Sequence, residues 1–358
     1  MLAELTINNL RNISALTLIP SSGVNLLLGA NGSGKTSLLE AIHLLALGRS
    51  FRTRSLKNVV QHKYHKMQVT AKIARHQMPV GLQYSPEKGL EIRLNSAPLK
   101  KLSELAVELP LQLIPANCHQ FFEQGPKYRR QFLDWGLFHV EQSFNYHWQS
   151  YKKVIQQRNS AIRQYKKIEE IELWDKHLIF HGEEINRQRL KRLETLLAEF
   201  ADIFPLLCPD YLNQDFSLKY RSGWTKELSL QEAISSTVLR DKQLGYTRSG
   251  PHAADWSFKV GGFDPAEVLS RGQQKLFFIA LCIAQIKTTE QENTKSILLI
   301  DDISSELDTT HQKIILETLS RLEVQAFITS TDETLSNLIK NEVLHSVFHV
   351  KQGVLVLE

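Results

Sequence analysis

The 358-residue sequence predicts an α/β protein in which a mixed sheet with flanking helices is interrupted by a long helical insertion. Apolar runs at residues 24–28 and 297–300 predict buried strands, and each leads directly into a polar turn. From residue 126, apolar and aromatic residues recur at three- and four-residue spacings, which is typical of amphipathic helices. We therefore expect residues 1–125 and 240–358 to form one part and residues 126–239 a separate helical part.

The first strands surround a glycine-rich turn. Residues 2–18 alternate and predict two short strands around residues 8–12, and a turn at residues 20–23 then leads into the strand at 24–28. After the glycine-rich turn, Leu38, Ile42 and Leu45 recur at helical spacing until Gly48 offers a stop. The order strand, glycine-rich turn and helix is therefore predicted for residues 24–48.

That turn matches the pattern G-x-x-x-x-G-K-[ST], which predicts a phosphate-binding loop. Glycines allow backbone N–H groups to surround a phosphate at the helix N-terminus, where the helix dipole also favours negative charge. Within the pattern, Lys35 is expected to reach the β- and γ-phosphates and the Thr36 hydroxyl to hold Mg²⁺. The predicted ATP-binding residues are Gly29, Ala30, Asn31, Gly32, Ser33, Gly34, Lys35 and Thr36.

The segment after this helix is basic. Residues 41–86 contain eight Lys or Arg and no Asp or Glu, and residues 127–192 contain 14 basic against 8 acidic residues. Because the net charge of the chain is only +5, the remainder is acidic. Such a separation of charge favours a polyanionic partner, most simply nucleic acid. Basic surfaces that are only solvated remain the alternative.

Strand-like runs at residues 67–74, 79–84 and 90–94 predict a small antiparallel sheet, and residues 109–115 predict a further core strand. Pro205 and Pro209 are expected to interrupt the helices of the insertion. Residues 326–329 predict another core strand, and residues 347–357 a terminal hairpin around Gln352 and Gly353.

Composition is that of an ordinary globular protein, with 42% apolar and 23% charged residues. The longest apolar run, residues 276–286, is too short to span a bilayer, and the N-terminus lacks the pattern of a signal peptide. The scattered Cys118, Cys208 and Cys282 argue against a disulfide framework or a zinc site. We therefore expect a cytoplasmic protein without a membrane partner.

Two later segments carry further candidate site residues. Ser270 is a suitable N-cap for the helix that begins near Gly272, which would make a second anion-accepting helix N-terminus, although a merely capped helix explains the segment equally well. Asp301 and Asp302 follow the strand at 297–300, at the strand end where open α/β sheets bind ligands. Asp301 is expected to complete the Mg²⁺ shell, unless it only caps the next segment, and Asp302 to orient or deprotonate the attacking water.

In this order, the phosphate loop, residues 269–273, the Asp301 and Asp302 pair, and residues 306–308 resemble the head of an ABC-type P-loop ATPase. The long separation between Lys35 and Ser270 resembles the chromosome-maintenance (SMC-like) branch, in which a helical arm is inserted into the head. Further stretches resemble the RecF family of bacterial recombination mediators, namely residues 10–12, 48–52, 125–136, 250–252 and 305–308.

This resemblance implies a mixed-sheet head with a small antiparallel β part and an inserted α-helical arm. It also implies an ATP-dependent homodimer, in which each phosphate loop faces Ser270, Gly272 and Gln273 of the other subunit. The dimer would clamp double-stranded DNA near a single-strand junction and release it through a weak, DNA-stimulated ATPase. With RecO and RecR, members of the family help RecA to load on gapped single-stranded DNA.

The DNA contacts are expected among basic residues that meet phosphates without reading bases, and Arg11 is a candidate for contact with adenine. The candidates for DNA contact are Arg49, Arg52, Arg54, Arg129 and Arg130. Arg52 and Arg54 could instead pair with carboxylates of the head, and Arg11 could be only a charge at a strand edge.

Two departures from the family pattern fall near these sites. Ala253 stands where a basic residue is usual, and Ala116 stands where an acidic residue is usual. No histidine follows residues 327–329, which disfavours a transporter ATPase. Two further alternatives are a nucleotide-gated DNA adaptor with scarcely any turnover and a nucleotide kinase. The kinase lacks a candidate acceptor-binding lid and leaves residues 270–275 unexplained.

Overall fold

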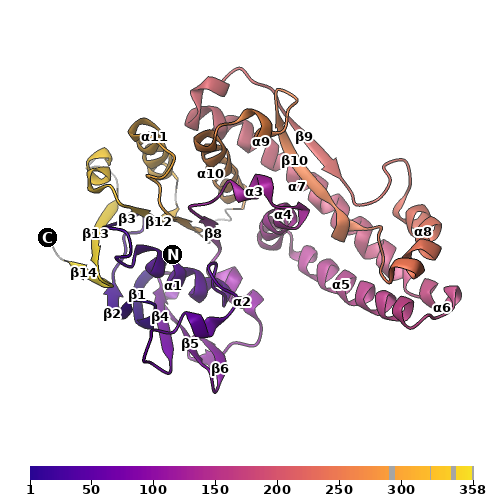
Figure 1. Cartoon of the computed structure of the whole chain (residues 1–358), viewed down its shortest axis with the longest axis horizontal. Coiled ribbons are helices and arrows are strands. Elements are labelled where there is room, and N and C mark those ends of the chain that lie inside the picture. Colours follow the sequence, from indigo (N-terminus) through magenta and orange to yellow (C-terminus); the bar gives the residue numbers. More distant parts are fainter. Residues whose placement is uncertain (290–294, 323, 340–343, 357–358) are drawn as a thin grey trace. The chain divides into compact units, whose positions relative to one another are not determined.

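The computed structural model in Figure 1 describes residues 1–289, 295–322, 324–339 and 344–356. The chain divides into a first unit, Met1–Cys118 with Glu290–Glu358, and a second unit, His119–Thr289. These borders differ from the predicted division at residues 126 and 240. Strand β10 (Asp255–Val260) and helix α10 (Arg271–Lys287) pack with β9 (Phe216–Arg221) and α7 (Asp175–Leu207) of the second unit. The division into a head and an arm as functional parts stays a prediction.

The first unit contains a mixed six-stranded sheet of order β14-β13-β3-β12-β11-β8, in which β14 is antiparallel to β13 and the other pairs are parallel. Its strands are β3 (Val24–Leu28), β8 (Leu111–Ile114), β11 (Ile297–Ile300), β12 (Gln325–Ser330), β13 (His345–Lys351) and β14 (Val354–Val356). Strands β3, β11 and β12 are buried along their whole length, as expected for the central strands of a parallel sheet. The predicted core strands and the terminal hairpin are thus confirmed, although Leu357 lies outside the described residues.

A second sheet of the same unit is antiparallel, with the order β2-β1-β4-β5-β6-β7. Its strands are β1 (Leu2–Leu10), β2 (Ile13–Leu18), β4 (Met67–Ile73), β5 (Met78–Ser85), β6 (Gly89–Leu94) and β7 (Ala97–Pro98). Helix α1 (Lys35–Leu47) shares one apolar cluster with strands of both sheets, which explains why nearly all of its residues are buried. The remaining helices are α2 (Leu102–Glu108), α11 (Thr309–Ser320) and the 3₁₀ turns η1 (Leu56–Asn58), η2 (Arg75–Gln77) and η5 (Glu333–Leu338).

The second unit is mainly helical. It comprises α3 (Gln120–Glu123), α4 (Pro126–Val140), α5 (Gln142–Arg163), α6 (Ile168–Glu172), α7 (Asp175–Leu207), η3 (Pro209–Tyr211), α8 (Leu230–Leu244), η4 (Pro251–Ala253), α9 (Pro265–Val268) and α10 (Arg271–Lys287). The expectation that Pro205 interrupts a helix is wrong, because α7 continues to Leu207 and Pro205, which lacks an N–H, lies in its last turn. This unit also contains a strand pair that the sequence did not predict, because β9 (Phe216–Arg221) pairs antiparallel with β10 (Asp255–Val260).

Buried arginines tie the helices of this unit together. Arg189 of α7 makes two hydrogen bonds of 2.8 Å to Asp134 of α4 and one of 2.6 Å to the Pro251 carbonyl. Arg158 of α5 pairs with Asp241 of α8 at 2.8 Å and with Asp175 at 2.8 Å. Both guanidinium groups are fully buried and paired, so they fix how these elements pack. No helix of the described chain is long and apolar enough to cross a membrane.

Candidate nucleotide-binding site

The glycine-rich loop connects β3 to the first turn of α1 and leaves no space for side chains at its ends. Gly29 and Gly34 have φ values of 149° and 120°, in the region that favours glycine. A Cβ at Gly29 would lie 2.3 Å from the Val350 carbonyl oxygen. The backbone of the loop is therefore held against β13, and its amides are left to surround an anion at the N-terminus of α1.

Lys35 closes this loop. Its Nζ donates hydrogen bonds of 2.6 Å to the Gly29 carbonyl and 2.9 Å to the Ala30 carbonyl. Burial lowers the pKa of Lys35, while Asp302 and Asp301 act in the opposite direction. The ammonium is thus held in the loop by two carbonyl groups, where a phosphate would offer it a stronger, charged partner.

Thr36, Asp301 and Thr329 meet at the carboxyl ends of the central strands. The hydroxyl groups of Thr36 and Thr329 each donate a 2.9 Å hydrogen bond to Asp301 Oδ1. A hydroxyl and a carboxylate oxygen in contact are ligands that Mg²⁺ prefers, usually with waters and substrate phosphates completing the shell. The residues present therefore fit a magnesium site, for which the sequence predicted Thr36 and Asp301 but not Thr329.

Asp302 has an unusual backbone conformation. Its φ is 56°, in the left-handed region, and its N–H donates a 2.7 Å hydrogen bond to Thr329 Oγ1. The Ser304 hydroxyl donates to Asp302 Oδ1 at 3.0 Å. A strained residue held by side chains at a strand end is typical of a functional position, and this supports the role expected for Asp302.

These residues line one cleft of about 510 Å³. Six further residues that line it are Arg11, Asn12, Ser37, Arg52, Ala116 and Thr331. Ala116, one of the two departures from the family pattern, is thus placed at the nucleotide cleft. No role was predicted from the sequence for Asn12 or Thr329, although Asn12 donates a 3.2 Å hydrogen bond to the Gly32 carbonyl. Their contacts depend on strands that are distant in sequence, and no local pattern signals them.

Arg11 and Arg52 reach the cleft from around a buried carboxylate of α1. Glu40 is fully buried and accepts two hydrogen bonds of 2.8 Å from Arg11, one from Ser50, and a 3.5 Å contact from Arg52. Burial alone would raise the pKa of Glu40, but the hydrogen bonds from Arg11 and Ser50 bring it below its ordinary value. The alternative that Arg52 pairs with a carboxylate of the first unit is thus confirmed.

The candidate DNA residues fall into two groups. Arg49 and Arg54 are exposed in the basic segment of the first unit. In the second unit, Arg129 makes hydrogen bonds of 2.8 and 3.1 Å to Asp255, and Arg130 donates to the Ala254 carbonyl at 2.6 Å. The surplus of basic residues in 127–192 therefore includes several that face inward.

Ser270 is the N-cap of α10, as predicted. Its hydroxyl accepts a hydrogen bond from the Gln273 N–H at 3.3 Å, and Gln273 Oε1 accepts from the Ser270 N–H at 3.0 Å. Tyr211 donates a further hydrogen bond of 3.3 Å to Gln273 Oε1. Ser270 and Arg271 are exposed, so this helix N-terminus is open to an external anion.

The turn of the hairpin β13–β14 contacts the phosphate loop, and this contact was not predicted from the sequence. The N–H of Gly353 donates a 2.7 Å hydrogen bond to the Ser33 carbonyl, and its Cα lies 3.3 Å from where a Cβ on Gly34 would stand. A Cβ at Gly353 would lie 2.2 Å from the Asn12 carbonyl oxygen. The turn therefore braces the phosphate loop from outside.

Comparison with known proteins places the chain among DNA repair proteins. Residues 1–356 match the family described as "RecF/RecN/SMC N terminal domain". The chain is 40% identical over 359 residues to the DNA replication and repair protein RecF of Nitrosococcus oceani, covering 98% of each chain. It is 38% identical to the protein of the same name from Pseudoalteromonas translucida, covering 99% of each.

Solved structures agree with this similarity. A structure of the recombination mediator protein RecF with ATP, described as part of the RecFOR pathway, superposes with a TM-score of 0.83 at 26% identity and covers 99% of this chain and 96% of its own. An Smc head bound to the C-terminal winged-helix domain of ScpA superposes with a TM-score of 0.59 at 15% identity, covering 99% of this chain and 97% of its own. The second likeness shows the ABC-type head fold alone.

Proposed function

The chain belongs to the RecF family of DNA replication and repair proteins, and from this membership we propose that it is an ATP-dependent DNA clamp. ATP would bind at the phosphate loop, two subunits would close on double-stranded DNA near a single-strand junction, and slow hydrolysis would release it. The observation that carries this proposal is the meeting of Lys35, Thr36, Asp301 and Thr329 at one cleft.

Within that cleft, each side chain has one task. Lys35 would exchange its two carbonyl partners for the β- and γ-phosphates, and the loop amides would hold the rest of the triphosphate. Thr36 and Asp301 would hold Mg²⁺, which supplies neutralisation of the phosphate charge. Asp302 would orient the attacking water through its carboxylate, while Thr329 fixes the backbone that carries it.

Arg11 is proposed for the base rather than the phosphates. Its Nε and Nη2 donate to Glu40 and its Nη1 donates to the Asn58 carbonyl at 2.7 Å, so its hydrogen-bonding groups are used within the protein. The flat face of such a fixed guanidinium remains suited to stacking against an aromatic ring such as adenine. Arg11 would therefore orient the nucleotide without a hydrogen bond to it.

The second helix N-terminus would complete the site in trans. Ser270, Gly272 and Gln273 lie at the start of α10, where the N–H groups and dipole favour the γ-phosphate of ATP bound to another subunit. These three residues are called the signature segment below. ATP would then stabilise the dimer directly, because each of the two nucleotides would be bound between the phosphate loop of one subunit and the signature segment of the other.

DNA would meet the exposed cations of the basic segment, foremost Arg49 and Arg54, with Arg52 at the edge of the nucleotide cleft. Contacts by Arg129 and Arg130 stay a prediction that would require them to leave their present partners. With RecO and RecR, the clamp would promote RecA loading on gapped single-stranded DNA in the cytoplasm.

The experiment that tests this proposal is a duplex-binding titration with and without ATP and Mg²⁺, for the wild type and Lys35→Met. We expect ATP to strengthen duplex binding of the wild type and to leave Lys35→Met unchanged. Equal duplex affinity of the wild type with and without ATP would refute an ATP-dependent clamp.

A second candidate, a DNA adaptor that binds ATP but scarcely turns it over, is favoured by one observation. Asp302 is a shorter acid than glutamate and is fixed in a left-handed backbone conformation, so it has limited reach to a water. Asp302→Asn separates the two functions, because a clamp timed by hydrolysis would remain on DNA longer in this variant. An adaptor would keep the lifetime of the wild-type complex.

A further inference from the structure

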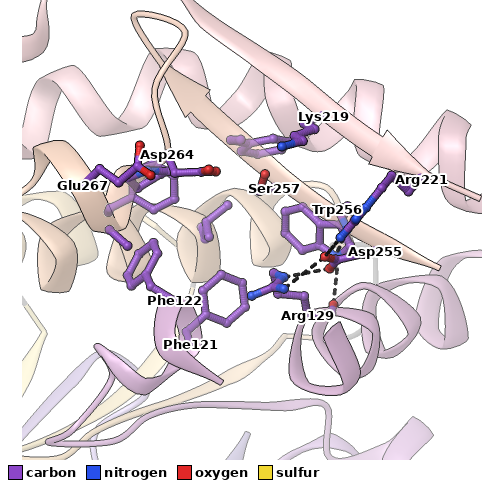
Figure 2. Close-up of a pocket in the computed structure, with 15 residues that line it drawn as sticks. Phe121, Phe122, Arg129, Lys219, Arg221, Asp255, Trp256, Ser257, Asp264 and Glu267 are labelled. Atoms are coloured by element: carbon purple, nitrogen blue, oxygen red, sulfur yellow. Dashed lines mark hydrogen bonds and ion pairs between the residues drawn. The ribbon is translucent and has the colours of Figure 1, made fainter. Parts of the chain in front are cut away.

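The second unit contains a pocket of about 310 Å³, whose lining shares only Arg129 with the residues considered for the ATP and DNA sites (Figure 2). Its floor is apolar and comes from three elements, with Phe121 and Phe122 from α3, Trp256 and Phe258 from β10, and Phe277 from α10. Such a pocket, lined by aromatic side chains with a few polar groups, is the usual form of a binding site.

Two exposed apolar residues border, in the sequence, the segment 264–267 that lines this pocket. Phe263 and Val268 are 61% and 40% exposed, and they flank the lining residues Pro265 and Glu267. Apolar surface that is contiguous with a pocket is typical of protein–protein interaction sites.

The charged groups of the pocket are separated in space. Figure 2 shows Lys219 and Arg221 on the side of β9, and Asp264 and Glu267 on the opposite side, with Phe121 and Phe122 below them in this view. Asp255 accepts hydrogen bonds from both Arg129 and Arg221, and Lys259 pairs with Asp264 at 2.6 Å. Lys219 and Glu267 have no ion pair within the described chain. The pocket therefore has a cationic side and an anionic side.

This distribution of charge decides between kinds of ligand. The lining has three cations, Arg129, Lys219 and Arg221, and three carboxylates, Asp255, Asp264 and Glu267. A nucleic-acid strand would gain little from a lining without net positive charge, because phosphate neutralisation dominates such binding. An aromatic side chain between one acidic and one basic group would match both the floor and the two sides.

We propose that this pocket docks a segment of a partner protein that inserts one aromatic side chain, with an acidic residue toward Lys219 and Arg221 and a basic residue toward Glu267. The aromatic ring would bury its surface against Phe121 and Phe122, which supplies affinity, and the two charges would fix its orientation.

A partner bound in the pocket would also affect the signature segment. Pro265 and Glu267 belong to α9, which ends at Val268, two residues before Ser270. A partner seated on α9 would restrict the backbone that leads to the N-terminus of α10. We therefore expect it to change ATP-dependent dimerisation, a consequence that rests on the proposed function, whereas the docking itself does not.

Docking is tested with fluorescein-labelled nonapeptides of glycine and serine that carry a central tryptophan between one aspartate and one lysine. Matched peptides replace the tryptophan by alanine, both charges by aspartate, or both by lysine. We expect the mixed-charge tryptophan peptide to bind at least about tenfold more tightly than each of the other three, and an unlabelled single-stranded oligonucleotide not to displace it. Equal affinity for all four peptides, or displacement by the oligonucleotide, would overturn the proposal.

Three variants test whether the peptide binds in this pocket. Ser257→Trp fills the pocket, whereas Ser217→Trp adds the same side chain to the neighbouring strand outside its lining. We expect only the first to abolish peptide binding. Lys219→Glu should shift the preference to the peptide with two lysines, a reversal that loss of folding cannot produce. Retained binding by a folded Ser257→Trp protein, shown by an unchanged unfolding midpoint, would place the peptide elsewhere.

The effect of docking on ATP-dependent dimerisation is measured separately. The peptide at saturation should shift the ATP concentration needed for dimerisation of the wild type and have no effect on Ser257→Trp. If the peptide binds but no dimer forms with ATP under any condition, the proposed function fails while docking stands. If dimerisation is normal and the peptide does not bind, the docking proposal alone fails.

Discussion

The two units of the chain both bury charged side chains, but they do so in opposite ways. In the first unit, Lys35 at the start of α1 and Asp301 and Asp302 after β11 line a cleft, where a ligand can reach them. In the second unit, Arg158 and Arg189 are fully buried and paired with carboxylates of neighbouring helices. The comparison shows that a buried charge indicates a ligand site where it faces a cleft and a structural role where its partners enclose it.

The largest expected effect comes from a substitution that breaks the buried arginine–carboxylate pairs of the second unit. Arg189→Ala leaves Asp134 and the Pro251 carbonyl without their partner and should lower the free energy of unfolding by about 3–5 kcal/mol. Denaturant titration of the whole chain measures this loss. Arg187→Ala, on an exposed face of the same helix, serves as the control and should leave the midpoint unchanged. A loss below about 1 kcal/mol for Arg189→Ala would contradict the structural role.

Acid should weaken the second unit more than the first. Burial lowers the pKa of His139 and His252 in the second unit, and of His43 in the first, to about 4 in each case. The unfolded chain therefore binds more protons than the folded chain between pH 6.5 and 4, so stability is complete above pH 6.5 and is lost as pH falls through this range.

The measurement is the urea midpoint at pH 7 and pH 5, which should be lower at pH 5. His43→Asn should reduce this difference without removing it, since two of the three histidines remain. A midpoint that does not change with pH in the wild type would show that these histidines titrate normally.

The brace on the phosphate loop should affect nucleotide binding more than folding. Gly353→Ala places a Cβ 2.2 Å from the Asn12 carbonyl oxygen at a φ of 80°, so the turn must move away from Ser33. We expect about tenfold weaker ATP binding, because small displacements at a phosphate site are costly. The matched control is Gly89→Ala, at a turn of the same unit with a φ of 73° and no atom within 4 Å. Equal ATP affinity of the two variants would refute the brace.

The smallest effect concerns the basic residues that are exposed in the first unit and engaged in the second. Arg49→Ala or Arg54→Ala should reduce the slope of log affinity against log salt for duplex DNA by about 0.9 each, by loss of counterion release. Arg130→Ala, whose side chain binds the Ala254 carbonyl, should leave the slope unchanged. A larger change for Arg130→Ala than for Arg49→Ala would reverse the assignment of the DNA surface.

Features that depend on local pattern were predictable from the sequence. The strands at 24–28 and 297–300, the helix from Lys35 and the N-cap at Ser270 follow from apolar runs, glycines and a capping residue, and the structure confirms each. The meeting of Thr36 with Asp301 was predictable because both follow strands whose carboxyl ends share one edge of a sheet.

Features that depend on contacts between residues far apart in the sequence could not be predicted from it. In the sequence, Arg129, Arg158 and Arg189 belong to the basic surplus from which a nucleic-acid surface was predicted. The structure pairs all three with carboxylates, and composition does not distinguish an exposed cation from a paired one. The sequence also did not predict the ribbon of β9 and β10, whose partners are more than thirty positions apart, or the contact of Gly353 with Ser33. These arrangements arise only when the whole chain packs.

The central claim, that the phosphate loop of one subunit works with the signature of the other, is tested most directly by mixing two defective variants. Lys35→Met disables the loop, and Ser270→Arg disables the signature, each at a separate unit of the chain. Sedimentation with ATP and Mg²⁺ should show monomers for either variant alone. An equimolar mixture should form dimers, because one of its two composite sites contains an intact loop and an intact signature. A mixture that stays monomeric while wild type dimerises, or a Ser270→Arg protein that dimerises as wild type does, would contradict the account.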